Sequence, residues 1–285
     1  MRLIKQEIKI LFLAITFLTR IRIPDFPYDH SLLRRVYRYF PLVGALIGAC
    51  GGLVFFISTA LLKLNLEPAL VLSLMSITML CGGLHEDGLA DSCDAFFGGG
   101  DRPVRILEIM KDSRIGSFGA LALFFFLLLK LSALKSLALK INIAGGQGVG
   151  EAGTTMASAT VSVATAAVIT AFIMANSLAR FFVTFFLIRG QYVNSQVQSK
   201  SSTLVTQLSN SRQLLQDLLV ASIQVVVLIF IAIIPLTKIF TILIVLLLAF
   251  FLLQKYYKNK IGGYTGDALG AAEQIFETII YLALS

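Results

Sequence analysis

The chain has 285 residues, of which 57% are hydrophobic and only 14% are charged, and this balance leaves too little polar surface for a soluble domain of that length. Several apolar runs reach the roughly 20 residues needed to cross the hydrocarbon core of a bilayer. The formal net charge of +8 is spread over many short loops rather than gathered in a basic tract, which argues against a nucleic-acid partner.

The N-terminal segment starts with basic residues and continues into the apolar run Ile10–Leu18, as a secretory signal would. No small-residue cleavage site follows, and Arg20 and Arg22 close the run. We therefore expect an N-terminal amphipathic helix that lies at the membrane interface or re-enters the bilayer.

Seven later segments are apolar enough to be spanning helices. They are 41–62, 68–85, 118–139, 155–188, 214–235, 239–254 and 267–284. Segment 155–188 is long for one span and is expected to tilt or to break near Asn176. The Gly-rich stretch 141–154 and the Ser-, Gln- and Asn-rich stretch 190–213 are expected to be loops. The sequence predicts an all-α, polytopic integral membrane bundle with one catalytic domain over residues 1–285.

The distribution of basic residues predicts the orientation in the bilayer. With residues 1–40 in the cytoplasm and the spans alternating, most Lys and Arg fall on the cytoplasmic side. An acidic segment at 87–94, a mixed segment at 111–114 and a Gly-rich turn before Asp267 then face the cytoplasm together. We expect these three clusters to converge on one site at the cytoplasmic face of the inner membrane.

An acidic stripe follows the second apolar segment. Asp87, Asp91 and Asp94 are spaced i, i+4 and i+7 and share one face of a helix. Three like charges near hydrocarbon are unfavourable unless a cation lies between them, and a hard divalent ion such as Mg2+ suits carboxylate ligands. Gly88 lets a ligand or a neighbouring helix approach the backbone. The stripe predicts a Mg2+ site, and a solvated helix face is the alternative.

Two further clusters follow the stripe. Gly98 and Gly99 offer backbone amides to an anion beside Arg102, although such glycines often serve only as hinges. Lys111 and Arg114 can neutralise phosphate charge, or they form an ordinary juxtamembrane basic cluster.

Single acidic and glycine residues extend these clusters. Asp112 is placed to complete a metal shell or to orient Arg114. A Gly-rich turn that ends at Gly266 leads into a helix N-terminus, which is a favourable anion site. Asp267 at this N-terminus is a further site residue or a cap of its own helix.

Other polar residues interrupt apolar segments. Asn176 and Arg180 are spaced i and i+4 and must point inward, where Arg180 can stabilise carboxylates or hold a phosphate. His85 is a candidate proton acceptor or a structural residue. Glu273 and Glu277 lie on a segment directed into the membrane, with Glu277 a candidate for a buried, protonated group. The residues together predict metal-dependent transfer of a phosphate-containing group at a membrane.

The same residues carry a resemblance to a known family. The matching stretches are Gly82-Gly83-Leu84 followed by HEDGLADSCDAFFGGGDR, then EIMKDSRIGSFGALAL and GGYTGDALGAAEQIFE, together with Thr19–Ile21 and Tyr39–Gly44. Over most of its length the chain resembles the cobalamin synthase (adenosylcobinamide-GDP ribazoletransferase) family. The loops 141–154 and 190–213 contribute nothing to the likeness.

The resemblance implies an Mg2+-dependent enzyme of the cytoplasmic membrane that completes the nucleotide loop of coenzyme B12. In that reaction the 3′-hydroxyl of α-ribazole, or of its 5′-phosphate, attacks the corrinoid-linked phosphorus of adenosylcobinamide-GDP. GMP leaves, and adenosylcobalamin or its 5′-phosphate forms. Carried onto this sequence, the metal and catalytic positions are Asp87, Asp91 and Asp94, and the further site residues are Asp112, Arg114 and Asp267.

The expected site therefore has three groups of residues. The catalytic candidates are Asp87, Asp91, His85, Arg114 and Lys111. The candidate metal ligands are Asp87, Asp91, Asp94, Asp112 and Asp267. The candidate residues for binding the remaining groups of the substrates are Gly98, Gly99, Arg102, Arg180 and Gly266.

Two other functions fit parts of the pattern. A CDP-alcohol phosphotransferase that makes phospholipid also uses aspartates on membrane helices, but its Ala-Arg pair and its second pair of aspartates are missing here. A cation-coupled transporter would carry inverted repeats around a midplane site, whereas this sequence shows no repeat and its acids lie at the rim. The oligomeric state stays open, with a homo-oligomer among the options.

Overall fold

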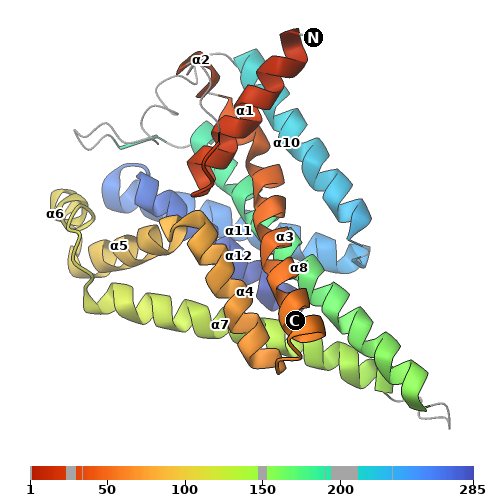
Figure 1. Cartoon of the computed structure of the whole chain (residues 1–285). Coiled ribbons are helices and arrows are strands. Elements are labelled where there is room, and N and C mark those ends of the chain that lie inside the picture. The colour runs from red at the N-terminus through yellow and green to blue at the C-terminus, as the bar shows by residue number, and fades with distance from the viewer. Residues whose placement is uncertain are drawn as a thin grey trace.

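The computed structural model describes residues 2–23, 30–33, 35–146, 153–189, 191–193, 211–232 and 234–285. Every named element in these ranges is a helix (Figure 1). The one strand-like feature in the described part of the chain is an isolated bridge between Tyr192 and Tyr264. The predicted all-α class is confirmed.

The helices follow one another with short connections. The N-terminal half forms α1 (Arg2–Leu18), α2 (His30–Leu33), the 3-10 helix η1 (Val36–Tyr39), α3 (Phe40–Phe56), the π-helical turn η2 (Ile57–Leu61), α4 (Leu66–Cys81), α5 (Leu84–Gly98) and α6 (Pro103–Ile109). The C-terminal half forms α7 (Ser117–Gly146), α8 (Gly153–Arg189), α10 (Ser211–Ile231), α11 (Leu236–Ile261) and α12 (Gly266–Leu284).

Five helical stretches in the described residues are long and apolar enough to span a membrane. They are Val36–Leu61, Ser117–Ile141, Val163–Arg189, Leu214–Ile231 and Leu236–Ile261. These stretches confirm five of the seven predicted segments and a multi-pass membrane protein. The long fourth segment is one continuous helix, α8, which runs through Asn176 without a break.

The other two predicted segments, 68–85 and 267–284, differ from the five spans. The first corresponds to the short α4, which meets α5 at an angle of 88°, so the pair forms a broken span or a re-entrant loop. We treat α5, beyond the bend, as outside the spanning segments. The second segment forms α12, whose Asp267, Glu273 and Glu277 make it too charged to count as an apolar span.

The predicted loops are shorter than expected. Helix α7 continues to Gly146 and α8 begins at Gly153, so most of the Gly-rich stretch 141–154 is helical. Within 190–213, α10 already begins at Ser211. Residues 147–152, 190 and 194–210 lie outside the described residues.

Helix α1 confirms the helix predicted at the N-terminus, and its location at the membrane interface stays a prediction. One face of α1 is buried through Ile10, Leu13 and Ala14, whereas Ile4 and Ile8 are exposed. The buried face packs against η1 and α3. This packing attaches α1 to the bundle near the site described below.

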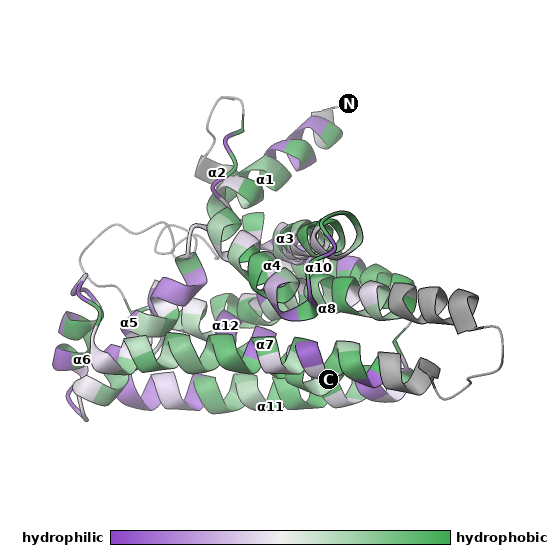
Figure 2. Cartoon of the chain, turned by 60° about the horizontal axis from the view of Figure 1, so that its bottom comes forward, coloured by the Kyte–Doolittle hydropathy of each residue, from purple (hydrophilic) through white to green (hydrophobic). Residues whose placement is uncertain are grey.

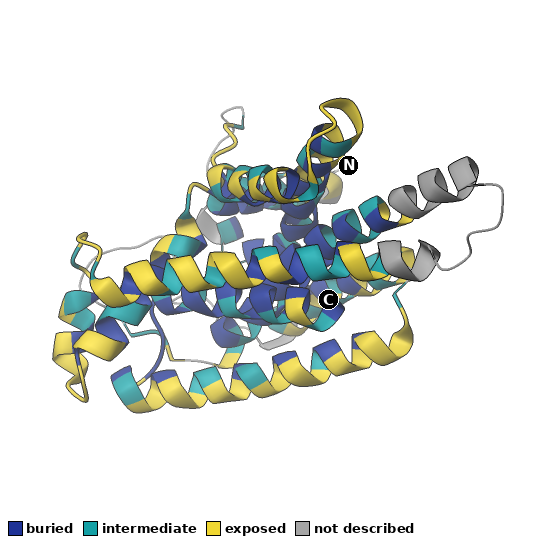
Figure 3. Ribbon diagram, turned by 90° about the horizontal axis from the view of Figure 1, so that it is seen from below, coloured by how far each residue is buried: buried dark blue, intermediate teal, exposed yellow. Residues whose placement is uncertain are grey.

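Helix α8 lies at the centre of the bundle. In its apolar stretch 78% of the residues are buried, against 22% in α7 and α11 and 17% in α10, so these three helices carry the faces available to lipid (Figure 3). Glycines of α3 allow close contact with α8, because a Cβ at Gly44 or Gly48 would lie 2.3 Å from the carbonyl oxygen of Asn176 or Phe172. Small residues at such contacts are typical of membrane helices.

The end of the molecule that carries α6 is hydrophilic. Figure 2 shows purple residues in α6, among green ones, and in the turns beside it, at one end of the apolar helices α7 and α11. Arg102, Arg105, Lys111 and Arg114 are all exposed there. This polar end is where the acidic stripe of α5 also lies.

A sharp bend between α4 and α5 directs the stripe toward this end. Gly82 and Gly83 adopt φ values of 67° and 69°, a left-handed conformation that favours glycine. The N–H of Gly82 donates to the carbonyl of Met79, which closes α4. Helix α5 then packs between α7 and α12, and this position brings its acids to the first turn of α12.

Candidate active site

The site is built where α5 crosses α12 through two glycines. A Cβ at Gly88 would lie 2.8 Å from the carbonyl oxygen of Asp267 and 3.2 Å from the Cα of Gly270. A Cβ at Gly270 would in turn lie 3.3 Å from the Cα atoms of Gly88 and His85. Because neither position has room for a side chain, the two backbones touch. The expectation that Gly88 admits a neighbouring helix is confirmed.

The crossing gathers acids from two distant segments, as expected from the orientation argument. Asp87 is exposed, and Asp91 and Asp267 are half-buried. Burial, and then the charges of Asp87, Asp267 and Asp94, raise the pKa of Asp91 to about 7. Burial and the charge of Asp87 also raise the pKa of Asp267. We call Asp87, Asp91 and Asp267 the open acid cluster, because these like charges face one another.

Asp94, the third member of the predicted stripe, has a different environment. Its two carboxylate oxygens accept hydrogen bonds from the backbone amides of Gly116 at 2.7 Å and Gly119 at 2.9 Å. A Cβ at either glycine would lie 2.4 Å from a carboxylate oxygen of Asp94. Asp94 therefore caps the start of α7, a role that the helical spacing alone did not indicate.

The cap on α7 also fixes the loop that carries Lys111, Asp112 and Arg114 beside α5. Arg114 donates from Nε to Asp112 Oδ1 at 2.9 Å and from a terminal nitrogen to Oδ2 at 2.6 Å. These hydrogen bonds hold the pKa of the Asp112 carboxyl at about 2. Of the two predicted roles of Asp112, this geometry corresponds to the orientation of Arg114. Lys111 and Arg114 are both exposed to solvent.

The glycines at the end of α5 serve packing. The N–H of Gly99 donates to the carbonyl of Ala95 at 2.8 Å, so this amide is not available to an anion. A Cβ at Gly99 would lie 2.6 Å from Ile106 Cγ1, and the missing side chain lets α6 fold back onto α5. Gly98 is the last residue of α5, and Arg102 lies exposed just before α6. The structure does not bring these residues to the open acid cluster through any contact in the described chain.

The start of α12 leaves Asp267 available. The hydroxyl of Thr265 accepts a hydrogen bond from the N–H of Ala268 at 3.2 Å and so caps the helix. The alternative in which Asp267 caps its own helix is not what the structure shows. A carboxylate in the first turn is favoured by the helix dipole, which helps Asp267 to remain close to the stripe.

Behind the open acid cluster lies a buried network around Arg180. The guanidinium of Arg180 contacts Glu273 at 2.6 Å and donates to Asn176 Oδ1 at 2.9 Å. The imidazole Nδ1 of His85 lies 3.3 Å from both Arg180 and Glu273. The expectation that Asn176 and Arg180 point inward is confirmed. Burial and the charge of Arg180 lower the pKa of His85 to about 3, so its imidazole is neutral.

A second buried pair extends the network, and the sequence analysis missed its cation. Lys130 of α7 donates to Glu277 at 2.8 Å and to the side-chain oxygen of Gln274 at 2.7 Å. The hydroxyl of Tyr281 donates to the other oxygen of Glu277 at 2.9 Å. Glu277 is thus paired, not an isolated protonated acid. A lysine inside an apolar span is itself a signal for an interior partner.

A cavity of about 340 Å³ opens beside these groups, between α1, α3, α5, α8 and α12. Its polar lining consists of His85, Arg180, Glu273 and Asp267. Gly266 also lines this cavity. The cavity therefore joins the buried network to one member of the open acid cluster.

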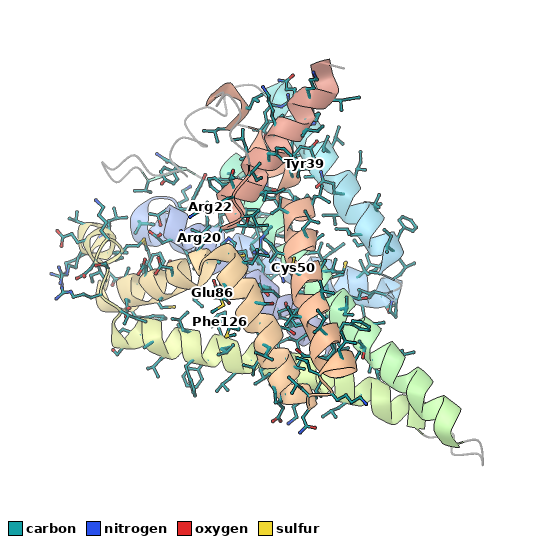
Figure 4. All side chains as sticks on the ribbon, in the orientation of Figure 1. Arg20, Arg22, Tyr39, Cys50, Glu86 and Phe126 are labelled. Carbon is teal, nitrogen blue, oxygen red and sulfur yellow. The ribbon has the colours of Figure 1, made fainter. Side chains whose placement is uncertain are left out.

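Arg20 packs against the bend that precedes α5, a role that the sequence analysis did not assign to it. Its backbone N–H donates to the carbonyl of Leu80 at 2.8 Å, and its side chain fills the space over Gly82. Figure 4 shows Arg20 and Arg22 beside the bend between α4 and α5, on the same side as Glu86. The signal that could have identified Arg20 is its place in the matching stretch Thr19–Ile21.

The open acid cluster fits a hard cation in its donor chemistry. Asp87, Asp91 and Asp267 supply oxygen ligands, and their mutual repulsion is what an opposite charge would relieve. Within the described residues, no three His, Cys, Asp or Glu side chains lie close enough together to hold a metal ion. A bound ion would therefore draw these carboxylates together or share them with substrate oxygens.

The fold and the site define a class: a polytopic helical membrane protein with facing carboxylates and exposed basic residues at one polar end. The chain belongs to the cobalamin-5-phosphate synthase family, whose model matches residues 10–285. The family assignment replaces the two alternatives, a CDP-alcohol phosphotransferase and a cation-coupled transporter. No solved structure matches the chain.

Several curated relatives match nearly the whole chain. An adenosylcobinamide-GDP ribazoletransferase of Shewanella amazonensis is 36% identical over 283 residues, which cover 98% of this chain and 96% of the relative. Proteins of the same name from Shewanella piezotolerans and Shewanella oneidensis are each 35% identical, over 98% of this chain and 96% and 94% of the relatives.

Proposed function

We propose that this protein is an adenosylcobinamide-GDP ribazoletransferase that catalyses the final step of nucleotide-loop assembly in cobalamin biosynthesis. The observation that carries the proposal is the crossing of α5 and α12, where acids of two separate matching stretches meet beside a cavity. The relatives' names supply adenosylcobinamide-GDP and a ribazole group, and we take the acceptor to be α-ribazole or its 5′-phosphate. The site supplies the charge arrangement that such a transfer needs.

The proposal includes Mg2+ as the cofactor. The open acid cluster, Asp87, Asp91 and Asp267, would hold the ion. When bound, Mg2+ neutralises charge on the phosphoryl group and on the leaving GMP. Asp94 is left out of this set because the amides of α7 occupy both of its oxygens. Asp112 is left out because Arg114 binds it.

The protein's own residues account for binding and proton transfer. Arg114, oriented by Asp112, and Lys111 offer exposed positive charge to the diphosphate of the corrinoid substrate. The ribazole 3′-hydroxyl forms a bond to the corrinoid-linked phosphorus, and the bond from this phosphorus to the oxygen of GMP breaks. The hydroxyl proton passes to a base, for which His85 and a carboxylate of the open acid cluster are the candidates.

We place the site at the cytoplasmic face of the inner membrane. The support is the basic, hydrophilic end formed by α6 and the loop to α7 (Figure 2), together with the bias of Lys and Arg toward that side. A cysteine introduced at Lys258, which is exposed near the end of α11, should react with a reagent supplied from the cytoplasm. Labelling from the outside would contradict this orientation.

The decisive experiment combines purified protein, adenosylcobinamide-GDP and α-ribazole. We expect a cobalamin product and GMP in equal amounts when Mg2+ is present, and no product after treatment with EDTA. Restoration by added Mg2+ shows that the chelator did not denature the protein. Absence of product under all conditions would overturn the function, whereas product formation that is insensitive to EDTA would overturn only the metal.

A further inference from the structure

We propose that the cavity between α1, α3, α8 and α12 holds the planar base of the acceptor nucleoside, and that the corrinoid diester approaches from the open side. The inference rests on the proposed function and adds a place for one substrate. The cavity measures about 340 Å³, a size that small-molecule sites commonly have. The apolar walls of the cavity, the incompletely bonded Arg180 and the position next to Asp267 each favour the base of the nucleoside as the occupant.

The walls of the cavity suit an apolar ring. They are formed by Phe17 of α1, Phe40 of α3, and Val183 and Leu187 of α8, with Leu269 of α12. Phe17 and Phe40 stack with their ring centroids 5.7 Å apart and form one aromatic wall. Aromatic and aliphatic walls favour a flat, methylated benzimidazole, which buries apolar ring surface against them.

Arg180 lines the cavity, and its guanidinium group is not fully hydrogen-bonded among the described residues. Arg180 is only 2% exposed, and its Nε has no hydrogen-bond partner among the described residues. An unsatisfied buried donor is costly unless a ligand or water completes it. The base of α-ribazole has one ring nitrogen free of the sugar, and this nitrogen can accept a hydrogen bond from such a donor.

The position of the cavity places a bound nucleoside beside the reacting groups. Gly266 and Asp267 line the cavity at the start of α12, and Asp267 belongs to the open acid cluster. The ribose of a nucleoside whose base is inside would therefore lie toward the carboxylates. The corrin macrocycle is far larger than the cavity, so it must remain outside, on the side where Asp87, Lys111 and Arg114 are exposed.

The test fills the cavity from its apolar wall on α8. Val183→Phe adds a ring to α8 where Val183 is 8% exposed. We expect the KM for α-ribazole to rise about tenfold or more, with the KM for adenosylcobinamide-GDP and the Mg2+ requirement unchanged. Binding of radiolabelled α-ribazole alone, measured by equilibrium dialysis, should weaken by the same factor. The matched control is Val226→Phe on α10, where Val226 is 49% exposed, and it should change neither constant.

A second variant keeps the test valid if Val183→Phe does not fold. Val183→Ala enlarges the same wall, and it should lower the KM for a nucleoside with a bulkier base relative to that for α-ribazole. Unchanged α-ribazole binding in a folded Val183→Phe protein would overturn the inference, as would a rise confined to the KM of the corrinoid substrate. The latter result, or retention of α-ribazole binding with loss of a co-purified lipid, would assign the cavity to another occupant. These results leave the proposed function intact, because it fails only if the wild-type protein makes no product.

Discussion

Helix α12 carries acids of two kinds, and their surroundings differ. Asp267 in its first turn faces Asp87 and Asp91 across the crossing with α5, and no cation of the described chain is paired with these three. Glu273 and Glu277, further along the helix, are each 1% exposed and are paired with Arg180 and Lys130. The first group keeps its like charges without a cationic partner among the described residues, and the second is neutralised by the protein's own cations. Removal of an acid should therefore affect catalysis in the first group and stability in the second.

The largest effect is expected from Asp91→Asn. The substitution keeps the shape of the side chain and removes one of several repelling charges, so the protein should stay folded while turnover falls by about a thousandfold. Turnover with saturating substrates and Mg2+, together with the unfolding temperature in detergent, measures both effects. Asp101→Asn is the control, because Asp101 is exposed and pairs only with Lys260. Near-normal turnover in both Asp91→Asn and Asp87→Asn would mean that the open acid cluster is not the reaction centre.

Lys130→Met tests the buried side of the comparison. It leaves Glu277 charged and unpaired in the interior, and we expect the free energy of unfolding to fall by about 3–5 kcal/mol. The matched control is Lys135→Met, five residues further along α7, because Lys135 pairs with Glu67 at the surface, and loss of such a pair should change stability by less than about 1 kcal/mol. Unfolding in detergent measures both variants, and the double variant Lys130→Met/Glu277→Gln should regain part of the loss. Equal losses of unfolding free energy in Lys130→Met and Lys135→Met would contradict the distinction between a buried and a surface ion pair.

Gly88→Ala tests the contact that assembles the open acid cluster. The added Cβ would lie 2.8 Å from the carbonyl oxygen of Asp267, so α5 and α12 must move apart and the carboxylates lose alignment. Turnover should fall about tenfold or more, because small displacements of reacting groups are costly. Gly51→Ala serves as the control, since its Cβ would clash with the side chain of Ile77, which can rotate, whereas the nearest backbone atom, the carbonyl oxygen of Ser73, is at an ordinary 3.6 Å. A larger loss of turnover in Gly51→Ala than in Gly88→Ala would contradict the role of the crossing.

The sequence predicted much of this arrangement because its strongest signals are local. Apolar length predicted five of the spans, and the spacing of the aspartates predicted one shared face on α5. The convergence of Asp267 with that face followed from the alternation of the spans. What failed depends on contacts between segments. The 88° bend at Gly82 and Gly83 cannot be read from hydropathy, because two short helices and one long helix have the same apolar content.

The partners of buried charged side chains also could not be predicted from local sequence patterns. Lys130 lies within an apolar segment, and its partner Glu277 is 147 residues away in sequence. The cavity beside Arg180 combines side chains of five helices, and no spacing within one helix encodes it. Periodicity gives the face on which a residue lies, whereas the tertiary packing determines what that face meets.

Substitution of Asp94 is expected to have the smallest effect. It tests whether acids on one face of α5 have different roles. Asp94 shares the face of Asp87 and Asp91, yet it caps α7 through the amides of Gly116 and Gly119. Asp94→Ala should lower the free energy of unfolding by about 1–2 kcal/mol, as loss of a helix cap does, and Asp94→Asn should cost less because its amide oxygen still accepts one hydrogen bond. The Mg2+ concentration that gives half-maximal turnover should stay unchanged in Asp94→Asn. A marked increase in that concentration would show that Asp94 is a metal ligand like its neighbours. All three aspartates of α5 would then belong to the reaction centre, and the structural role would begin only at the loop after α6.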